Sequence, residues 1–262
     1  MAIGTRSYAR GYLGSGGLPP GIKWLLISNV GIFLIYFFFR DLRVTFDLLG
    51  LRPSAVVHGY VWQLATYMFL HAGIGHVLWN MLALWMFGRE FEDIWGTRKF
   101  LRFYFLCGIG AGVCVVIANY LTGTQDSLTV GSSGAIYGLL MAAAVLWPDR
   151  QMLFYLLIPI KMKYFVMIIG ALAFLNSFQG NSGVSNVAHL GGMLVAYILL
   201  KTPGALGSGR TSSYTKSPGM MEQMRQSYQS WKIQRAKKRF QVYMKKQGAG
   251  TTKNDDRDRW VN

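Results

Sequence analysis

Charge is scarce in this sequence. Only 15% of its 262 residues are Asp, Glu, Lys or Arg, whereas a soluble domain typically carries about 25%. In contrast, 52% of the residues are hydrophobic, and the mean hydropathy is +0.27. This composition argues against a soluble globular protein. It also excludes disorder for most of the chain, because there is ample apolar surface to bury.

Cysteine is nearly absent. Cys107 and Cys114 are the only two, and they lie seven residues apart in one apolar stretch. Along a helix this is about 10 Å, which is too far for a disulfide bond. A disulfide-stabilised scaffold is therefore excluded, and both thiols are expected to be free and packed within a helix.

Acidic residues are also few. The chain has 11 Asp and Glu against 27 Lys and Arg, so its formal net charge is +16. An apolar protein with such a basic excess needs an explanation, and the positions of the charges along the chain provide one.

Six apolar runs predict membrane-spanning helices. Runs shorter than about 20 residues would be tolerated inside a bundle or in a locally thinned bilayer. A further apolar segment, Met152–Ile160, is short and contains Pro159, and it is predicted to be interfacial or re-entrant. The predicted spans are Trp24–Phe39, Gly73–Gly88, Phe100–Leu121, Ser133–Trp147, Tyr164–Phe178 and Asn186–Leu200.

The basic residues fall on one side of these spans. The positive-inside rule then predicts that both termini are cytoplasmic. The first apolar run follows a polar, glycine-rich stretch and is expected to remain as a signal anchor. Of the 27 Lys and Arg residues, 24 lie in the alternate segments 1–23, 89–102, 149–163 and 201–262.

The same pattern divides the chain into domains. The last segment has 14 basic and 4 acidic residues, with Met221, Met224, Tyr228 and Trp231 at helical spacing. Two interpretations of this tail remain open. It is either a solvated basic amphipathic helix or a helix that lies on anionic lipid headgroups. Nucleic-acid binding is not expected. The predicted domains are a cytoplasmic segment 1–21, a six-span domain 22–201, a flexible linker 202–219 and a basic cytoplasmic tail 220–262.

Polar side chains within the spans raise functional questions, because they are costly there. A zinc protease is not supported, since there is no HExxH motif and His71 and His76 do not share a helical face. The aspartates lie in loops or at span edges, and no lysine lies at membrane depth. A paired-aspartate protease and a Ser–Lys dyad are therefore also unsupported, and no metal or cofactor is predicted.

A serine and a histidine remain as candidates. Gly-Ser-Ser-Gly at 131–134 stands at the start of the fourth span, and its glycines permit a tight turn into the helix. The free backbone N–H groups at this helix N-terminus could bind an oxyanion. Gly134 and Gly192 each lie on a small-residue helix face, and two such faces can pack closely. This packing could bring Ser133 within hydrogen-bond reach of His189. An ordinary loop and a histidine satisfied by a neighbouring helix remain the alternatives.

His76 and Asn80 are four residues apart and share one helical face. Both can donate hydrogen bonds, so together they could stabilise a developing negative charge. Hydrogen bonding between helices is the alternative.

Taken together, these motifs resemble the rhomboid intramembrane serine proteases, and they occur in the family's order. The pattern Gly88-x3-Glu92-x3-Gly96 after the second span is also found in many members. One departure is Trp62-Gln63, where the family usually has Trp-Arg, so the usual arginine contacts of the first loop are in doubt. The matching motifs are His71-x4-His76-x3-Asn80, Gly131-Ser132-Ser133-Gly134 and Ala188-His189-x2-Gly192.

The resemblance implies an all-α, six-transmembrane-helix rhomboid bundle over about residues 22–201. It further implies a serine endopeptidase that cleaves single-pass transmembrane proteins in or near their spans, in the cytoplasmic (inner) membrane of a bacterium. Ser133 would be the nucleophile and His189 the general base, with Tyr137 stacked on the imidazole. The oxyanion hole would comprise His76, Asn80 and the Ser133 N–H, and the supporting residues would be His71, Gly131, Gly134 and Gly192.

Two other functions are considered. A non-catalytic rhomboid-like protein that binds membrane clients typically lacks the serine or the histidine, and this chain has both. A transporter or channel would have charged or paired polar residues along a pathway, which the sequence does not show. Within the protease hypothesis, the uncharged loop Gly180–Gly183 is a candidate lid for substrate entry.

Overall fold

A computed structural model describes residues 17–39, 44–154, 158–177 and 186–206, together with Lys232 and Arg235. The chain divides into two compact units, Met1–Ser212 and Ser213–Asn262. All elements discussed below belong to the first unit. The predicted lid loop, the linker after residue 206 and the helical pattern of the tail lie outside the described residues.

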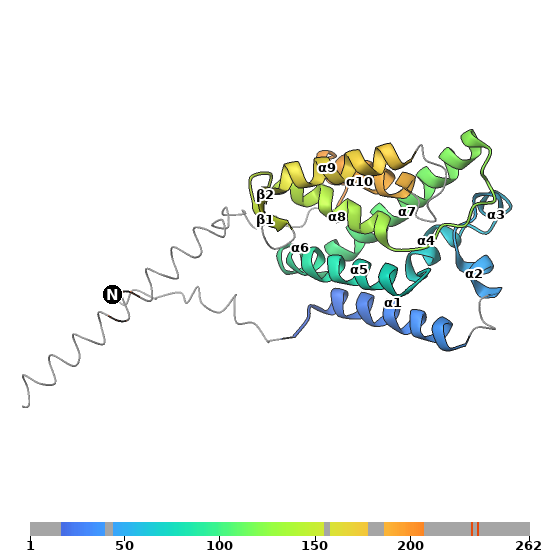
Figure 1. Ribbon diagram of the computed structural model, residues 1–262, viewed down its shortest axis with the longest axis horizontal. Coiled ribbons are helices and arrows are strands. Elements are labelled where there is room, and N and C mark those ends of the chain that lie inside the picture. Colours follow the sequence, from blue (N-terminus) through green and yellow to red (C-terminus); the bar gives the residue numbers. More distant parts are fainter. Residues whose placement is uncertain are drawn as a thin grey trace, which may run out of the picture. The chain divides into compact units, whose positions relative to one another are not determined.

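Helices coincide with all six apolar runs of the sequence (Figure 1). The second run is longer than predicted, because the helix continues through a π-helical segment, η4, into α6. The helices are α1 (Pro20–Phe38), α5 (Ile74–Ala83) with η4 (Leu84–Gly88) and α6 (Arg89–Trp95), α7 (Thr97–Thr122), α8 (Ser133–Leu146), α9 (Met162–Asn176) and α10 (Asn186–Lys201).

Two of the described helices, α1 and α7, are long and apolar enough to cross a membrane alone. A third span results if the pair Gln63–Phe69 and Ile74–Trp95, bent by 98°, is counted as one. Helices α8, α9 and α10 are apolar but have only 14, 15 and 16 residues, fewer than the roughly 20 a lone span needs. The molecule is therefore a helical membrane protein, and the count of six spans stays a prediction.

Short helices fill the connection between α1 and α5, which we call the first loop. They gather at one end of the bundle (Figure 1). Pro53 stands at the first helical position of α3, where its missing N–H costs nothing. These elements are α2 (Val44–Leu49), α3 (Pro53–Val57), α4 (Gln63–Thr66) and the 3₁₀ helix η3 (Tyr67–Phe69).

The all-α expectation is wrong in one element. β1 (Gln151–Phe154) pairs antiparallel with β2 (Ile158–Lys161), in the segment predicted to be interfacial or re-entrant. Each strand of a two-stranded hairpin is an edge strand, so Pro159 is tolerated there. Lys163 and Lys161 donate to Asp149 beside the hairpin, and these contacts lower the pKa of that exposed carboxyl. The hairpin and the first loop lie at opposite ends of the bundle (Figure 1).

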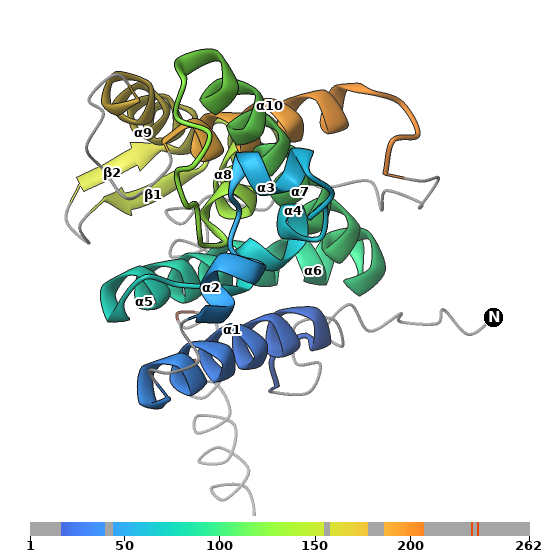
Figure 2. The ribbon, with the colours of Figure 1, turned by 90° about the vertical axis from the view of Figure 1, so that its right-hand side faces the viewer.

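Small residues allow α7, α8 and α10 to pack closely at the centre of the bundle, whereas α1 lies at its edge (Figure 2). A Cβ atom on Gly138 would lie 2.7 Å from the Cβ of Cys107, and one on Gly191 would lie 2.7 Å from the Cβ of Cys114. Both cysteines are free and sit in these helix contacts. The prediction of free, packed thiols is confirmed.

Glu92 fixes the start of α1. Its two carboxylate oxygens accept the backbone N–H groups of Gly21 and Ile22, each at 2.7 Å, and one also accepts the Thr97 hydroxyl at 2.6 Å. The first N–H groups of a helix lack partners within the helix, and a negative charge there is favourable. The buried carboxylate thus joins the end of the second helical stretch to the beginning of the first.

Candidate active site

Ser133 and His189 lie side by side although they are 56 residues apart in the chain. The Nε2 atom of His189 is 2.9 Å from the Oγ atom of Ser133. Ser133 is the first residue of α8, and His189 lies in the first turn of α10. The histidine is 6% exposed and the serine is half-buried, so the pair is largely protected from bulk solvent yet still reachable.

Glycines bring the two helices to this distance. A Cβ atom on Gly192 of α10 would collide with the carbonyl oxygen of Gly134 on α8. A Cβ atom on Gly134 would in turn lie 3.2 Å from the carbonyl oxygen of Ala188. The backbones therefore touch directly beside the Ser133–His189 contact, as the small-residue faces had suggested.

Tyr137 stacks on the ring of His189. Its ring centroid lies 4.0 Å from that of His189, and the two planes differ by only 2°. Tyr137 is one helical turn after Ser133, so the serine and the aromatic ring are carried on the same face of α8. The Nδ1 atom of His189 is buried and has no hydrogen-bond partner among the described residues. Among the described residues, the stacked Tyr137 ring and the Ser133 hydroxyl are therefore the contacts found for this imidazole.

His76 and Asn80 face the turn that precedes Ser133. Gly131 in this turn has a φ of +115°, which favours glycine. A Cβ atom there would also lie 2.7 Å from the His76 ring and 3.7 Å from the Asn80 side-chain nitrogen. The Nε2 atom of His76 and the Nδ2 atom of Asn80 are buried without a hydrogen-bond partner among the described residues. Two unused nitrogen groups therefore converge beside the start of α8.

The tautomer of His76 follows from its other nitrogen. The backbone N–H of Ala72 donates to Nδ1 of His76 at 3.4 Å. In the neutral ring an accepting Nδ1 leaves the hydrogen on Nε2. The Nε2–H group then points its donor toward the glycine turn.

Ser132 and His71 take no direct part in the Ser133–His189 contact. The Ser132 side chain is fully buried next to Tyr104. His71 packs edge-on against His76, with ring centroids 5.1 Å apart, and lines an apolar hollow of about 550 Å³ between α1 and the start of α5. His71 therefore packs against the His76 ring and makes no hydrogen bond with the Ser133–His189 pair.

Sequence reasoning missed the contacts of Gln63. This side chain, at the position of the family's usual arginine, is fully buried and hydrogen-bonded to three main-chain groups of the first loop. The neighbouring Trp62 is anchored to the same loop, because its indole N–H donates to the carbonyl of Leu48.

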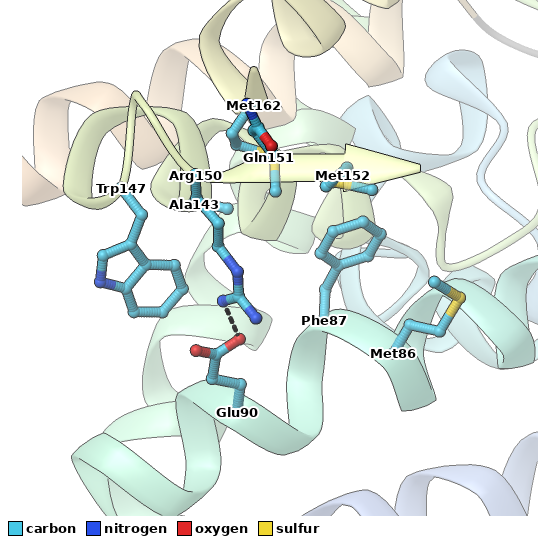
Figure 3. Close-up of a pocket in the computed structure, with 9 residues that line it drawn as sticks. All are labelled: Met86, Phe87, Glu90, Ala143, Trp147, Arg150, Gln151, Met152 and Met162. Atoms are coloured by element: carbon cyan, nitrogen blue, oxygen red, sulfur yellow. Dashed lines mark hydrogen bonds and ion pairs between the residues drawn. The ribbon is translucent and has the colours of Figure 1, made fainter. Parts of the chain in front are cut away.

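A smaller hollow of about 130 Å³ lies at the other end of α8 (Figure 3). Met86, Phe87 and Met152 line it, and Arg150 crosses it to form an ion pair with Glu90. No serine, threonine or cysteine is among the residues that line it, and it lies at the opposite end of α8 from Ser133. Among the described residues, no group of three or more His, Cys, Asp or Glu side chains could hold a metal ion.

Comparisons with known proteins bear on the whole arrangement. The chain matches the Rhomboid domain family over residues 58–203. It is 35% identical over 146 residues to the rhomboid relative YdcA of Bacillus subtilis. The aligned stretch covers 55% of this chain and 68% of YdcA. Rhomboid protease GluP of the same bacterium is 30% identical over 62% of this chain and 29% of GluP. Rhomboid protease AarA of Providencia stuartii is 31% identical over 53% of this chain and 57% of AarA. The chain thus spans less than two thirds of the length of GluP and of AarA.

Proposed function

Because this chain belongs to the rhomboid family, we propose that it is a serine-type intramembrane endopeptidase with a Ser133–His189 dyad. Its substrates are single-pass transmembrane proteins, which it cleaves in or near their membrane spans. The observation that carries the proposal is the 2.9 Å contact between Ser133 Oγ and His189 Nε2.

In the proposed reaction, Ser133 attacks the carbonyl carbon of the scissile peptide bond while His189 Nε2 takes the hydroxyl proton. His189 then returns the proton to the leaving amine, which breaks the C–N bond and leaves an acyl-enzyme. Water attacks the ester with the same histidine as base, which releases the second product and restores Ser133. Tyr137 keeps the ring aligned through both proton transfers.

The negative charge of the tetrahedral intermediate needs hydrogen-bond donors. The unused Nε2–H of His76, the amide of Asn80 and the backbone N–H of Ser133 at the start of α8 supply three. Gly131 keeps the turn small enough for His76 and Asn80 to reach it, and Gly134 and Gly192 keep α8 and α10 in contact.

The proposed setting is the cytoplasmic membrane of a bacterium, with six spans in residues 22–201 and both termini cytoplasmic. A basic tail over 220–262 would contact anionic lipids or remain solvated. Ser133 then begins its span at the non-cytoplasmic side, where water for acyl-enzyme hydrolysis is available. A substrate helix must unwind locally to present its peptide bond, so helix-destabilising residues near the cut should assist cleavage.

The test is cleavage of a single-pass transmembrane substrate by the purified protein in detergent. We expect Ser133→Ala and His189→Ala to reduce cleavage to background. Ser132→Ala is the matched control, because it removes a neighbouring buried hydroxyl that does not contact His189, and it should cleave like the wild type. A fluorophosphonate probe should label the wild type and Ser132→Ala but not Ser133→Ala.

Cleavage that survives either dyad substitution would reject the mechanism. A wild-type protein that binds transmembrane segments but neither cleaves them nor reacts with the probe would favour the non-catalytic client-binding function instead.

A further inference from the structure

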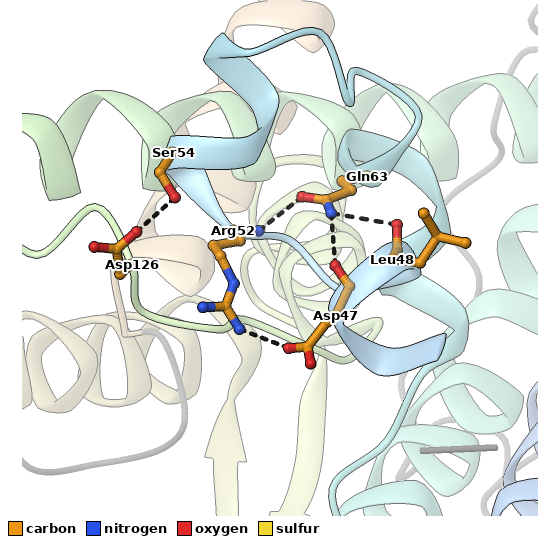
Figure 4. Close-up of polar contacts among 6 residues, drawn as sticks. All are labelled: Asp47, Leu48, Arg52, Ser54, Gln63 and Asp126. Atoms are coloured by element: carbon orange, nitrogen blue, oxygen red, sulfur yellow. Dashed lines mark hydrogen bonds and ion pairs between the residues drawn. The ribbon is translucent and has the colours of Figure 1, made fainter. Parts of the chain in front are cut away.

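The Gln63 side chain makes three hydrogen bonds within the first loop. Its Oε1 atom accepts the backbone N–H of Arg52 at 3.0 Å, and its Nε2 atom donates to the carbonyls of Asp47 and Leu48 at 3.0 and 3.2 Å. Figure 4 shows these three bonds converging on one amide from two sides of the loop. The side chain has no exposed surface, so each bond is made in a protected environment where it cannot be replaced by bulk water.

The segment that Gln63 holds is bonded to the turn before Ser133. Leu51 exchanges two main-chain hydrogen bonds with Thr129, at 2.9 and 2.8 Å. Close by, Ser54 donates its hydroxyl to Asp126 at 2.7 Å (Figure 4). The backbone N–H of Ser54 donates to the carbonyl of Gln125 at 2.9 Å. The first loop is therefore hydrogen-bonded to residues 125–129 of the connection between α7 and α8.

The same turn is held from a second point. The N–H of Gly131 donates to the carbonyl of Tyr67 at 2.9 Å, and Tyr67 follows Gln63 by one helical turn in the α4–η3 segment. Thr129 is thus bonded to the loop segment that the Gln63 side chain holds, and Gly131 is bonded to the helical stretch that carries Gln63. Between them and Ser133 lie only Val130 and Ser132.

We propose that Gln63 is a positioning residue for the oxyanion hole. It fixes residues 47–52, these fix Thr129, and the turn 129–131 then sets where the Ser133 N–H and the His76 donor meet the developing charge. This inference rests on the function proposed above. The neutral amide suits this task because it offers both a donor and an acceptor, whereas an arginine at the same position could only donate.

The expected effect is on turnover rather than on substrate binding. An oxyanion hole stabilises charge that exists only in the transition state, and a displacement of about 1 Å can cost on the order of 10²-fold in rate. A partly loosened turn should cost less. We therefore expect Gln63→Ala to lower kcat about tenfold while KM stays within about twofold of the wild type.

The experiment measures kcat, KM and amide hydrogen exchange on the full chain in detergent, below the thermal midpoint of each variant. The N–H groups of Thr129 and Gly131 are the reporters, because both donate to carbonyls of the first loop, those of Leu51 and Tyr67. Gln63→Ala should speed their exchange about tenfold or more. Arg52→Gln is the matched control, since it removes an exposed ion pair with Asp47 in the same loop but leaves the Gln63 bonds intact, and it should change neither readout.

Should Gln63→Ala fail to fold, Thr66→Val replaces it. Thr66 donates to the carbonyl of Leu49 at 2.6 Å, so its loss loosens the same loop by one bond, with a fall in kcat of about threefold. Unchanged exchange at 129–131, or faster exchange with unchanged kcat, overturns the proposal. A fall in kcat without faster exchange also overturns it.

Failure of the proposed function is a separate result. If the wild type does not cleave, or cleaves equally well as Ser133→Ala, the protease assignment is rejected. The exchange comparison between the wild type and Gln63→Ala needs no activity, and equal exchange at Thr129 and Gly131 would reject the role of Gln63 independently.

Discussion

The stacked pair of Tyr137 and His189 makes a prediction at the scale of single residues. An aromatic pair contributes about 0.5–1.5 kcal/mol beyond simple burial, and we predict that this energy restrains the imidazole. Tyr137→Phe keeps the ring and should retain most of kcat. Tyr137→Ala frees the imidazole and should lower kcat roughly tenfold, measured with substrate in excess of KM. Equal rates for the two variants would show that the stacking does not orient the base.

The donors of the proposed oxyanion hole are tested in the same way. Asn80→Ala should reduce kcat by on the order of 10²–10³, because one such donor typically contributes about 2.7–4 kcal/mol to the transition state. His76→Ala should act similarly, and the double variant should lose less than the product of the two effects. Steady-state kinetics give these values. A rise in KM with unchanged kcat would assign both side chains to substrate binding instead.

At the scale of helices, the contact between α8 and α10 depends on glycine. Gly192→Ala would push a methyl group into the carbonyl oxygen of Gly134, and such overpacking costs about 1–3 kcal/mol. We expect a lower thermal midpoint and loss of fluorophosphonate labelling, because Ser133 and His189 separate. Gly170→Ala on α9 is the control, since its methyl would meet only the flexible end of Met193 at 3.3 Å. Labelling of Gly192→Ala at the wild-type rate would contradict the prediction.

The joint between α1 and α6 depends on a carboxylate. Glu92→Gln replaces one acceptor oxygen with a donor that faces the N–H groups of α1, and it should lower the free energy of unfolding by about 2 kcal/mol. Reversible unfolding in mixed micelles measures this change. Asp93→Asn on the same helix is the control, because its partner Arg89 is 3.9 Å away and both are exposed. Catalysis per folded molecule should be unaffected in both variants.

Some of these elements could be predicted from sequence and others could not. Hydropathy located the helix in each of the six apolar runs but not the short helices of the first loop. The glycines of 131–134 and 188–192 indicated the close contact that brings Ser133 to His189. The hairpin at Gln151–Lys161 was missed because a short apolar run has no periodicity that separates strand from interfacial helix. The π-helical segment Leu84–Gly88 was missed because the helical pattern continues through it.

Gln63 shows a different limit. A single glutamine in a loop has no pattern, and its importance arises from burial against backbone groups of residues 47–52 that only folding brings together. The partner of Gly131 is likewise the carbonyl of Tyr67, 64 residues earlier in the chain. Main-chain contacts of this kind leave no trace in residue identity.

At the scale of the whole molecule, function and charge occupy different ends. Ser133, His189, His76 and the turn at Gly131 gather at the start of α8, next to the first loop. The hairpin, the Arg150–Glu90 ion pair and the lysines around Asp149 gather at its other end. The predicted topology assigns to the cytoplasmic side the four segments that hold 24 of the 27 basic residues. On that prediction, the net charge of +16 arises from the positive-inside bias rather than from substrate recognition.

This orientation leads to a prediction for the molecule in its membrane. Asp126 and Asp149 are both exposed, and they lie before and after α8. If both termini are cytoplasmic, Asp126→Cys should react with a membrane-impermeant maleimide added to spheroplasts, whose cytoplasmic membrane is intact. Asp149→Cys should react only after the membrane is opened, because the positive-inside rule keeps its lysine-rich neighbourhood in the cytoplasm. Cys107 is buried and Cys114 partly so, and the unsubstituted chain provides the background. The reverse pattern of labelling would invert the topology and place the dyad on the cytoplasmic side.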